Sequence, residues 1–295
     1  GGVGTAMAKH DFLAGFLTSG GADRLSAKYL INAVLRFATP EDAAAAAPDM
    51  AAATISAGTG PGGTPRRPIS LPKHPDTAAV ITNPEGMQTW TTLHAYTAEG
   101  PFVIAQQINN TDSTAEALEL LGNAIDVQRG MLAEFTPTPV DQLADLPIDP
   151  DGLLARTLPA GAMTNDPEQG LYGSHGAAAL MSQPQRSQKL FADTGMDSLS
   201  KALVNVYQAA DAKGAEAIVD DFFAEAVDSK FTPSSAVAGL PGARCALSPP
   251  PVLATNKRHF YCLVAAERYA IEVNAVEERD AHQQLAAQYL MLTAS

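Results

Sequence analysis

Basic residues, aromatic residues and cysteines are all scarce in this 295-residue sequence. Its 19 Lys and Arg are outnumbered by 32 Asp and Glu, so the net charge is −13 at pH 7. An acidic protein repels phosphate backbones, and we therefore expect no nucleic-acid partner. No apolar run approaches the roughly 18 residues that cross a membrane, so we expect no transmembrane span in this chain.

Motifs of catalysis and cofactor binding are missing too. The sequence has no Gly-x-Ser-x-Gly elbow, no phosphate-binding loop and no Cys or His pair at metal-ligand spacing. We therefore expect no catalytic residue, no cofactor and no metal. Ser174 and His175 come nearest to a nucleophile and base, but adjacent residues seldom face each other and the flanking glycines predict a turn. A turn is likewise predicted at His74, which precedes Pro75 and Asp76.

The sequence contains two cysteines, Cys245 and Cys262, and the residues around them predict neighbouring strands. One even pair so placed is typical of a disulfide, which forms in oxidising compartments. The alternative is two buried free thiols in a cytosolic protein. A disulfide fits an exported protein. Residues 1–4 have none of the features of a signal peptide. We therefore expect either that such a peptide has been removed or that the chain is a fragment.

Alternating apolar residues and helix caps recur in two parts of the chain. Alternation predicts strands at residues 30–37, 77–82, 90–97, 102–108, 203–207, 260–265 and 269–274, and one around Cys245. Helices are predicted behind the caps Thr39, Ser113 and Asp211 and at the C-terminal end. Residues 160–195 show no clear period.

The two parts share the order strand, helix, strand, hairpin, helix. Phe102 aligns with Tyr269, Glu99 with Glu267, and His94 falls opposite Cys262. We infer an internal duplication, the alternative being a chance likeness of two ordinary halves. The predicted fold class is α+β, with two similar halves that each form an antiparallel sheet with helices packed on one face.

The predicted domains are a first half over residues 1–135, a connecting segment over 136–197 and a second half over 198–295. The connecting segment is rich in Pro, Asp and Gly, which is typical of a linker or a surface excursion. We expect a cleft between the halves, where ligands commonly bind.

Several stretches resemble an uncharacterised family of actinobacterial cell-envelope lipoproteins, of the kind found in mycobacteria. They are residues 30–47 (LINAVLRFATPEDAAAAA), 149–159 (DPDGLLARTLP), 242–245 (GARC), 262–270 (CLVAAERYA) and 286–289 (AAQY). The resemblance implies an exported protein with a lipid anchor upstream of this chain and a domain of unknown function. It supplies no catalytic residues.

The expected function is a non-enzymatic binding or scaffolding module in the cell envelope, outside the membrane. Its partner is expected to be an envelope protein or an amphipathic small molecule, such as a lipid or glycan. The candidate recognition residues are Ser174, His175, Arg156 and Trp90, the sole tryptophan. Two alternatives are a hydrolase whose site is assembled from distant residues and a structural subunit of a larger envelope complex.

Overall fold

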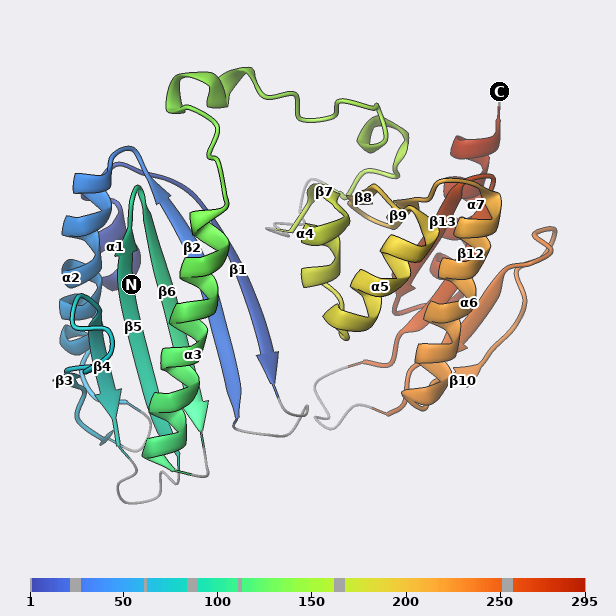
Figure 1. Cartoon of the computed structure of the whole chain (residues 1–295). Helices are drawn as coiled ribbons and strands as arrows, with labels where there is room; N and C mark the ends of the chain where they lie inside the picture. Colours follow the sequence, from blue (N-terminus) through green and yellow to red (C-terminus); the bar gives the residue numbers. More distant parts are fainter. Residues whose placement is uncertain are drawn as a thin grey trace. The chain divides into compact units, whose positions relative to one another are not determined.

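The structure is a computed structural model, and it describes residues 2–21, 28–60, 63–83, 90–110, 113–161, 168–250 and 257–294. The chain divides into two compact units, Gly1–Ala144 (unit 1) and Asp145–Ser295 (unit 2), each built on its own sheet (Figure 1).

Unit 1 holds a six-stranded antiparallel sheet in the order β1-β2-β6-β5-β4-β3. Its elements are α1 (Gly2–Met7), β1 (Phe12–Gly21), β2 (Tyr29–Phe37), α2 (Pro40–Ser56), β3 (Arg67–Ile69), β4 (Ala78–Thr82), β5 (Thr91–Glu99), β6 (Phe102–Asn110) and α3 (Thr114–Ala133). A 3-10 turn, Val140–Asp145, follows them.

Unit 2 holds a seven-stranded antiparallel sheet in the order β10-β11-β12-β13-β9-β8-β7. Its elements are a 3-10 turn (Leu154–Arg156), β7 (Gly170–Gly173), α4 (Ser174–Ala179), α5 (Pro184–Thr194), β8 (Ser198–Lys201), β9 (Asn205–Gln208), α6 (Ala212–Asp228), β10 (Thr232–Pro233), β11 (Arg244–Leu247), β12 (Phe260–Ala266), β13 (Tyr269–Ala275) and α7 (Glu278–Thr293).

The two units share one fold. The succession from α1 to α3 in unit 1 matches the succession from α5 to α7 in unit 2, element for element. The strand order matches as well, because β2-β6-β5-β4-β3 corresponds to β9-β13-β12-β11-β10. The predicted α+β class with two similar antiparallel halves is therefore confirmed, and β7 and α4 are additions to the repeat.

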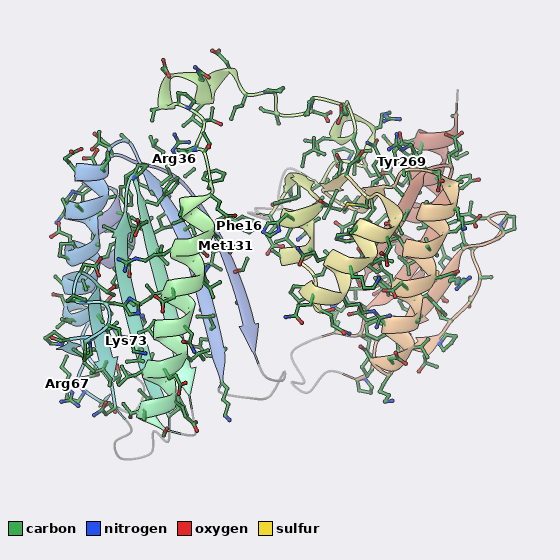
Figure 2. The ribbon with its side chains drawn as sticks, viewed as in Figure 1. Phe16, Arg36, Arg67, Lys73, Met131 and Tyr269 are labelled. Carbon is green, nitrogen blue, oxygen red and sulfur yellow. A yellow bond between two sulfur atoms is a disulfide. The ribbon has the colours of Figure 1, made fainter. Side chains whose placement is uncertain are left out.

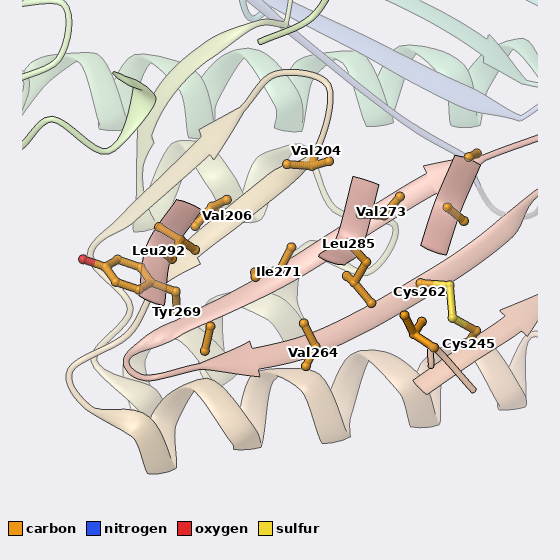
Figure 3. Close-up of a cluster of buried hydrophobic side chains, with 14 of the residues drawn as sticks. Val204, Val206, Cys245, Cys262, Val264, Tyr269, Ile271, Val273, Leu285 and Leu292 are labelled. Atoms are coloured by element: carbon orange, nitrogen blue, oxygen red, sulfur yellow. A yellow bond between two sulfur atoms is a disulfide. The ribbon is translucent and has the colours of Figure 1, made fainter. Parts of the chain in front are cut away.

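Helices cover both faces of each sheet, and the expectation of a single covered face was wrong. In unit 2, Cys262 and Val264 pack in the core cluster that contains α7, whereas Leu263 between them packs in the cluster that contains α6. All three are buried. A strand buried on both faces has consecutive apolar residues rather than alternating ones, and β12 shows this pattern. Figure 3 shows the cluster on the α7 side.

Local capping explains why the main helices begin where they do. Thr39 Oγ1 accepts a hydrogen bond from the Asp42 amide at 3.1 Å, and Ser113 Oγ accepts one from the Glu116 amide at 3.1 Å. Each oxygen satisfies an amide that has no partner inside the helix. The predicted starts of α2 and α3 are therefore confirmed.

The turns that link the hairpins correct the alignment of the two halves. Gly100 and Glu267 both begin two-residue turns with positive φ, 54° and 52°, so that Gly100 and not Glu99 corresponds to Glu267. Counting back along the strands, Cys262 corresponds to Ala95 rather than to His94. Its strand partner Cys245 corresponds to Ala79, which pairs with Ala95.

The segment 136–197 does not form a separate part of the structure. Residues up to 144 belong to unit 1, and those from 145 onward belong to unit 2. Phe191 of α5 is 1% exposed and packs in the α6-side cluster of unit 2. The later part of the segment thus contributes to the core of unit 2.

Candidate functional site

A pocket of about 380 Å³ lies between α3 and the loop that joins β3 to β4 in unit 1. The loop contributes Ser70, Leu71, Pro72, Lys73 and His74, and α3 contributes Leu118, Glu119, Gly122, Asn123 and Asp126. Lys73 marks the loop side of the pocket in Figure 2.

Hydrogen bonds and ion pairs hold the loop in place. The His74 amide donates to the Leu71 carbonyl at 3.0 Å, and the Thr77 amide donates to the His74 carbonyl at 3.1 Å. The guanidinium of Arg129, on α3, pairs with Asp76 in the loop. Because both ends of the turn are bonded, the His74 side chain is positioned by a rigid frame.

The imidazole of His74 is buried without a hydrogen bond. The residue is 4% exposed, and neither Nδ1 nor Nε2 has a hydrogen-bond partner among the described residues. Asp126 Oδ1 lies 3.7 Å from Nε2, too far for a hydrogen bond. A neutral imidazole carries one donor and one acceptor, and a buried group left unpaired costs about 1–3 kcal/mol. Such a group is expected to bind a water molecule or a ligand.

Gly122 lies beside this imidazole. It lies inside α3, where glycine costs about 1 kcal/mol relative to alanine, and its backbone does not need glycine because its φ is not positive. A Cβ atom at this position would lie 3.6 Å from His74 Nε2, in ordinary van der Waals contact. A methyl group at this position would therefore lie directly against Nε2, on the pocket lining that Gly122 shares with His74.

The corresponding loop of unit 2, between β10 and β11, places apolar side chains in the core, although its Ser234 Oγ is also buried without a hydrogen-bond partner among the described residues. Val237 is buried there, and Leu240 packs against the same cluster. The shared fold is thus completed by apolar side chains at this place in unit 2. An unpaired imidazole in unit 1 is therefore not a requirement of the fold.

The other side chains around the pocket are of mixed character. Leu71 and Leu118 belong to or pack against the core cluster under α3, whereas Lys73, Glu119 and Asp126 bring charges of both signs. Such a lining suits a small molecule with an apolar part and a hydrogen-bonding head group.

The predicted recognition residues do not form one cluster. Trp90 lies in unit 1, just before β5, whereas Arg156, Ser174 and His175 belong to unit 2. Ser174 and His175 are exposed at the start of α4. Arg156 is hydrogen-bonded to Tyr269 on β13. Gly173, which directly precedes Ser174, lies three strands away from Tyr269 across the sheet, a distance of roughly 14 Å.

Arg156 joins the start of unit 2 to its sheet. Its Nη2 donates to the Tyr269 hydroxyl at 3.0 Å, and its guanidinium carbon lies 5.2 Å from the centre of that ring. Gln288 of α7 donates to the Arg156 carbonyl at 2.7 Å. These contacts account for Arg156 as a structural residue, and its role in recognition stays a prediction.

A carboxylate in unit 2 is surrounded by hydrogen-bond donors. Glu272 Oε2 accepts from the Tyr207 hydroxyl at 2.5 Å and from Asn205 Nδ2 at 3.0 Å. Burial and the neighbouring Glu272 raise the pKa of both Tyr207 and Tyr261 well above the usual value. Because each group has a partner, the cluster does not call for a ligand.

One group of side chains in the described part of the chain has the geometry of metal ligands: Cys245, Cys262 and His282. Cys245 and Cys262 form the predicted disulfide, with Cα atoms 4.1 Å apart. The positions of the three residues in the sequence do not reveal that His282 lies beside the two cysteines.

Comparison with known proteins gives a family match over nearly the whole chain. The model of the DUF7373 N-terminal domain of unknown function matches residues 1–148, and that of the C-terminal domain matches residues 153–295. A search of curated proteins found no match. Among solved structures, the extracellular domain of PknH from Mycobacterium tuberculosis is similar at 19% identity and a TM-score of 0.32, over 41% of this chain and 67% of that chain.

None of the helices in the described ranges is both long and apolar enough to cross a membrane.

Proposed function

Since the chain belongs to the DUF7373 family, whose two domains are of unknown function, we propose a function from the residues that line its pocket. The protein is a binding protein, and the pocket of unit 1 binds a small amphipathic molecule. We place this protein outside the cytoplasmic membrane, in the cell envelope, with a lipid anchor upstream of the chain.

The buried, unpaired imidazole of His74 carries the proposal. A ligand hydroxyl, amide or carboxylate that enters from the pocket beside Gly122 would supply the missing hydrogen bond to Nε2. Because an unpaired buried group costs about 1–3 kcal/mol, a ligand that pairs it recovers that free energy on binding. The apolar part of the ligand would lie against Leu71 and Leu118.

The location is supported by the disulfide of unit 2. Disulfides persist in oxidising compartments and are rare in the cytosol. The resemblance of several stretches to envelope lipoproteins points the same way.

Hydrolysis is the second candidate, because the pocket contains a serine, a histidine and an aspartate, namely Ser70, His74 and Asp126. A nucleophile and its base are expected to be hydrogen-bonded, but neither ring nitrogen of His74 has a hydrogen-bond partner in the described ranges. Binding is therefore favoured over catalysis. Turnover of p-nitrophenyl acetate that is lost in Ser70→Ala would reverse this preference.

Two glycine variants of the same helix test the proposed pocket. Gly122→Ala places a methyl group against His74 Nε2, whereas Gly130→Ala is a matched control because nothing lies within 4 Å of its Cβ position. Both substitutions remove a glycine from α3, so both should raise the free energy of unfolding, by up to about 1 kcal/mol. Only Gly122→Ala should weaken binding.

The probe is n-octyl glucoside below its micelle-forming concentration, since it has an apolar chain and a hydroxyl-bearing head group. Binding is measured by calorimetry and by the nitrogen chemical shifts of the His74 ring. We expect shifts of these resonances in the wild type and in Gly130→Ala, and a loss of affinity of at least tenfold in Gly122→Ala. Equal binding by the two glycine variants, or no shift at His74 in the wild type, would contradict a pocket of this chemistry.

A further inference from the structure

The disulfide of unit 2 lies under the first turns of α7. Cys245 and Cys262 are directly opposite each other on β11 and β12, and they are 3% and 0% exposed. Both belong to the core cluster that α7 covers, where the sulfur atoms are visible in Figure 3. A ring nitrogen of His282, on α7, lies within 4.8 Å of both sulfur atoms.

His282 has an unsatisfied nitrogen at this place. Its Nε2 is buried and has no hydrogen-bond partner among the described residues. A disulfide is a poor hydrogen-bond acceptor and offers no proton, so it does not satisfy this nitrogen. The imidazole next to the two sulfur atoms therefore has a nitrogen whose donor or lone pair is unused.

Unit 1 shows that the fold does not need these three residues. From their N-caps, α3 and α7 match residue for residue, so that Leu118 corresponds to His282. The strand pair that corresponds to Cys245 and Cys262 is Ala79 and Ala95. Two sulfurs and an imidazole thus replace three apolar side chains together.

We propose that Cys245, Cys262 and His282 hold one thiophilic cation, Cu⁺ or Zn²⁺, when the disulfide is reduced. A dithiol reductant supplies two electrons and two protons, the S–S bond breaks, and the reductant becomes a cyclic disulfide. Binding of the cation then releases the two thiol protons to solvent and forms two metal–sulfur bonds. The neutral imidazole donates its nitrogen lone pair as the third ligand.

The chemistry of the three ligands agrees with such cations. Thiolate and imidazole are the ligands that Cu⁺ and Zn²⁺ take in proteins. Two thiolates neutralise Zn²⁺, which suits a buried site, whereas a site with three ligands and apolar walls suits the low coordination number of Cu⁺. Val264 and Leu285 are among the apolar neighbours in the same cluster.

The disulfide and the metal site exclude each other, because the same two sulfur atoms form either bond. In an oxidising compartment the disulfide closes the site. In a reduced chain the cation would link β11 to β12 in place of the disulfide, and His282 would join α7 to the same cation.

The experiment uses the full chain, reduced with dithiothreitol and freed of reductant under nitrogen. Zn²⁺, Cu⁺ and, as a spectroscopic substitute, Co²⁺ are added in separate arms, and bound metal per chain is measured. Two variants introduce the residues found at the corresponding positions of unit 1: His282→Leu, and the double variant Cys245→Ala with Cys262→Ala. His259→Ala is the control, since His259 is exposed. Circular dichroism confirms that each variant is folded.

We expect one metal per reduced chain, sulfur-to-cobalt charge-transfer absorption, and no binding to the oxidised protein. Affinity should fall at least tenfold in His282→Leu, should be lost in the double alanine variant and should be unchanged in His259→Ala. The Zn²⁺ and Cu⁺ arms show which cation binds more tightly. Binding by reduced wild type that does not exceed the double variant, or equal affinity in His282→Leu and the wild type, would overturn the site. Neither result bears on the pocket of unit 1.

Discussion

The Tyr207 hydroxyl lies 2.5 Å from Glu272 Oε2, inside the core of unit 2, and donates a hydrogen bond to it. Tyr207 is fully buried, so this carboxylate obtains part of its solvation from the tyrosine rather than from water. A hydrogen bond to a charged group contributes more than one between neutral groups.

Tyr207→Phe should therefore lower the free energy of unfolding by about 1–3 kcal/mol. Urea unfolding followed by circular dichroism measures the loss. Tyr289→Phe is the control, because the Tyr289 hydroxyl has no hydrogen bond to the described residues and its loss should change stability little. Equal effects of the two substitutions would show that Glu272 does not depend on Tyr207.

His94 makes unit 1 sensitive to acid. Burial, and to a smaller extent the charge of Arg66, lower the pKa of His94 from 6.5 to about 4. Between these two values the unfolded chain binds a proton that the folded chain does not, so stability falls as the pH falls from 6.5 to 4. The difference in pKa corresponds to about 3 kcal/mol over this interval.

His94→Gln should remove this part of the pH dependence while it keeps a polar side chain of similar size. Unfolding free energies at pH 7, 5.5 and 4 measure it. His175→Gln is the matched control, since His175 is exposed and should leave the slope as in the wild type. A wild-type slope in His94→Gln would assign the acid sensitivity to other groups.

The shared fold predicts where a second disulfide fits. Ala79 and Ala95 are paired on β4 and β5 at the positions that correspond to Cys245 and Cys262. Ala79→Cys combined with Ala95→Cys should form a disulfide in the oxidised protein and stabilise unit 1 by about 3 kcal/mol in the chain-entropy model.

Trp90 is the sole tryptophan and lies in unit 1, so its fluorescence follows the unfolding of that unit. The single variant Ala95→Cys controls for the added volume of a sulfur atom in the core. Two free thiols in the oxidised double variant would show that the strand positions are not equivalent.

Arg156→Ala should loosen the start of unit 2. It removes the hydrogen bond and the cation–π contact with Tyr269, together worth about 1–2 kcal/mol. We expect faster proteolysis within residues 145–158 and a matching loss of stability. Arg279→Ala is the control, because its side chain is 84% exposed. If Arg156→Ala changes neither measurement, the contact with Tyr269 contributes nothing to the attachment.

The strands and helices that bury one regular face could be predicted from the sequence. The caps Thr39, Ser113 and Asp211 all begin helices, and the two strands predicted on either side of Glu267 form a hairpin. Strand β1 was missed because most of its side chains are exposed on both faces, so its burial does not alternate. Helix α5 was missed because its composition is polar, although Phe191 is anchored in the core.

The pocket of unit 1 could be predicted only in part. His74 was correctly placed in a turn, but its burial results from α3, which lies far along the chain. One weak signal was present in the sequence, since Gly122 lies inside a helix, where glycine is unfavourable. Neither the unpaired ring nitrogens nor the approach of His282 to the cysteines follows from spacing, because both depend on tertiary contacts.

The strand order of the units has a consequence for the timing of folding. In each sheet the early strand pairs with the last one of its unit, as β2 at Tyr29–Phe37 does with β6 at Phe102–Asn110. Such pairing between distant segments forms slowly, because a long loop must close first. The ribosome completes β6 well before it adds Cys245. Unit 1 therefore has every strand it needs before any oxidant of thiols is required, and only the later unit depends on the redox state of its surroundings for its final cross-link.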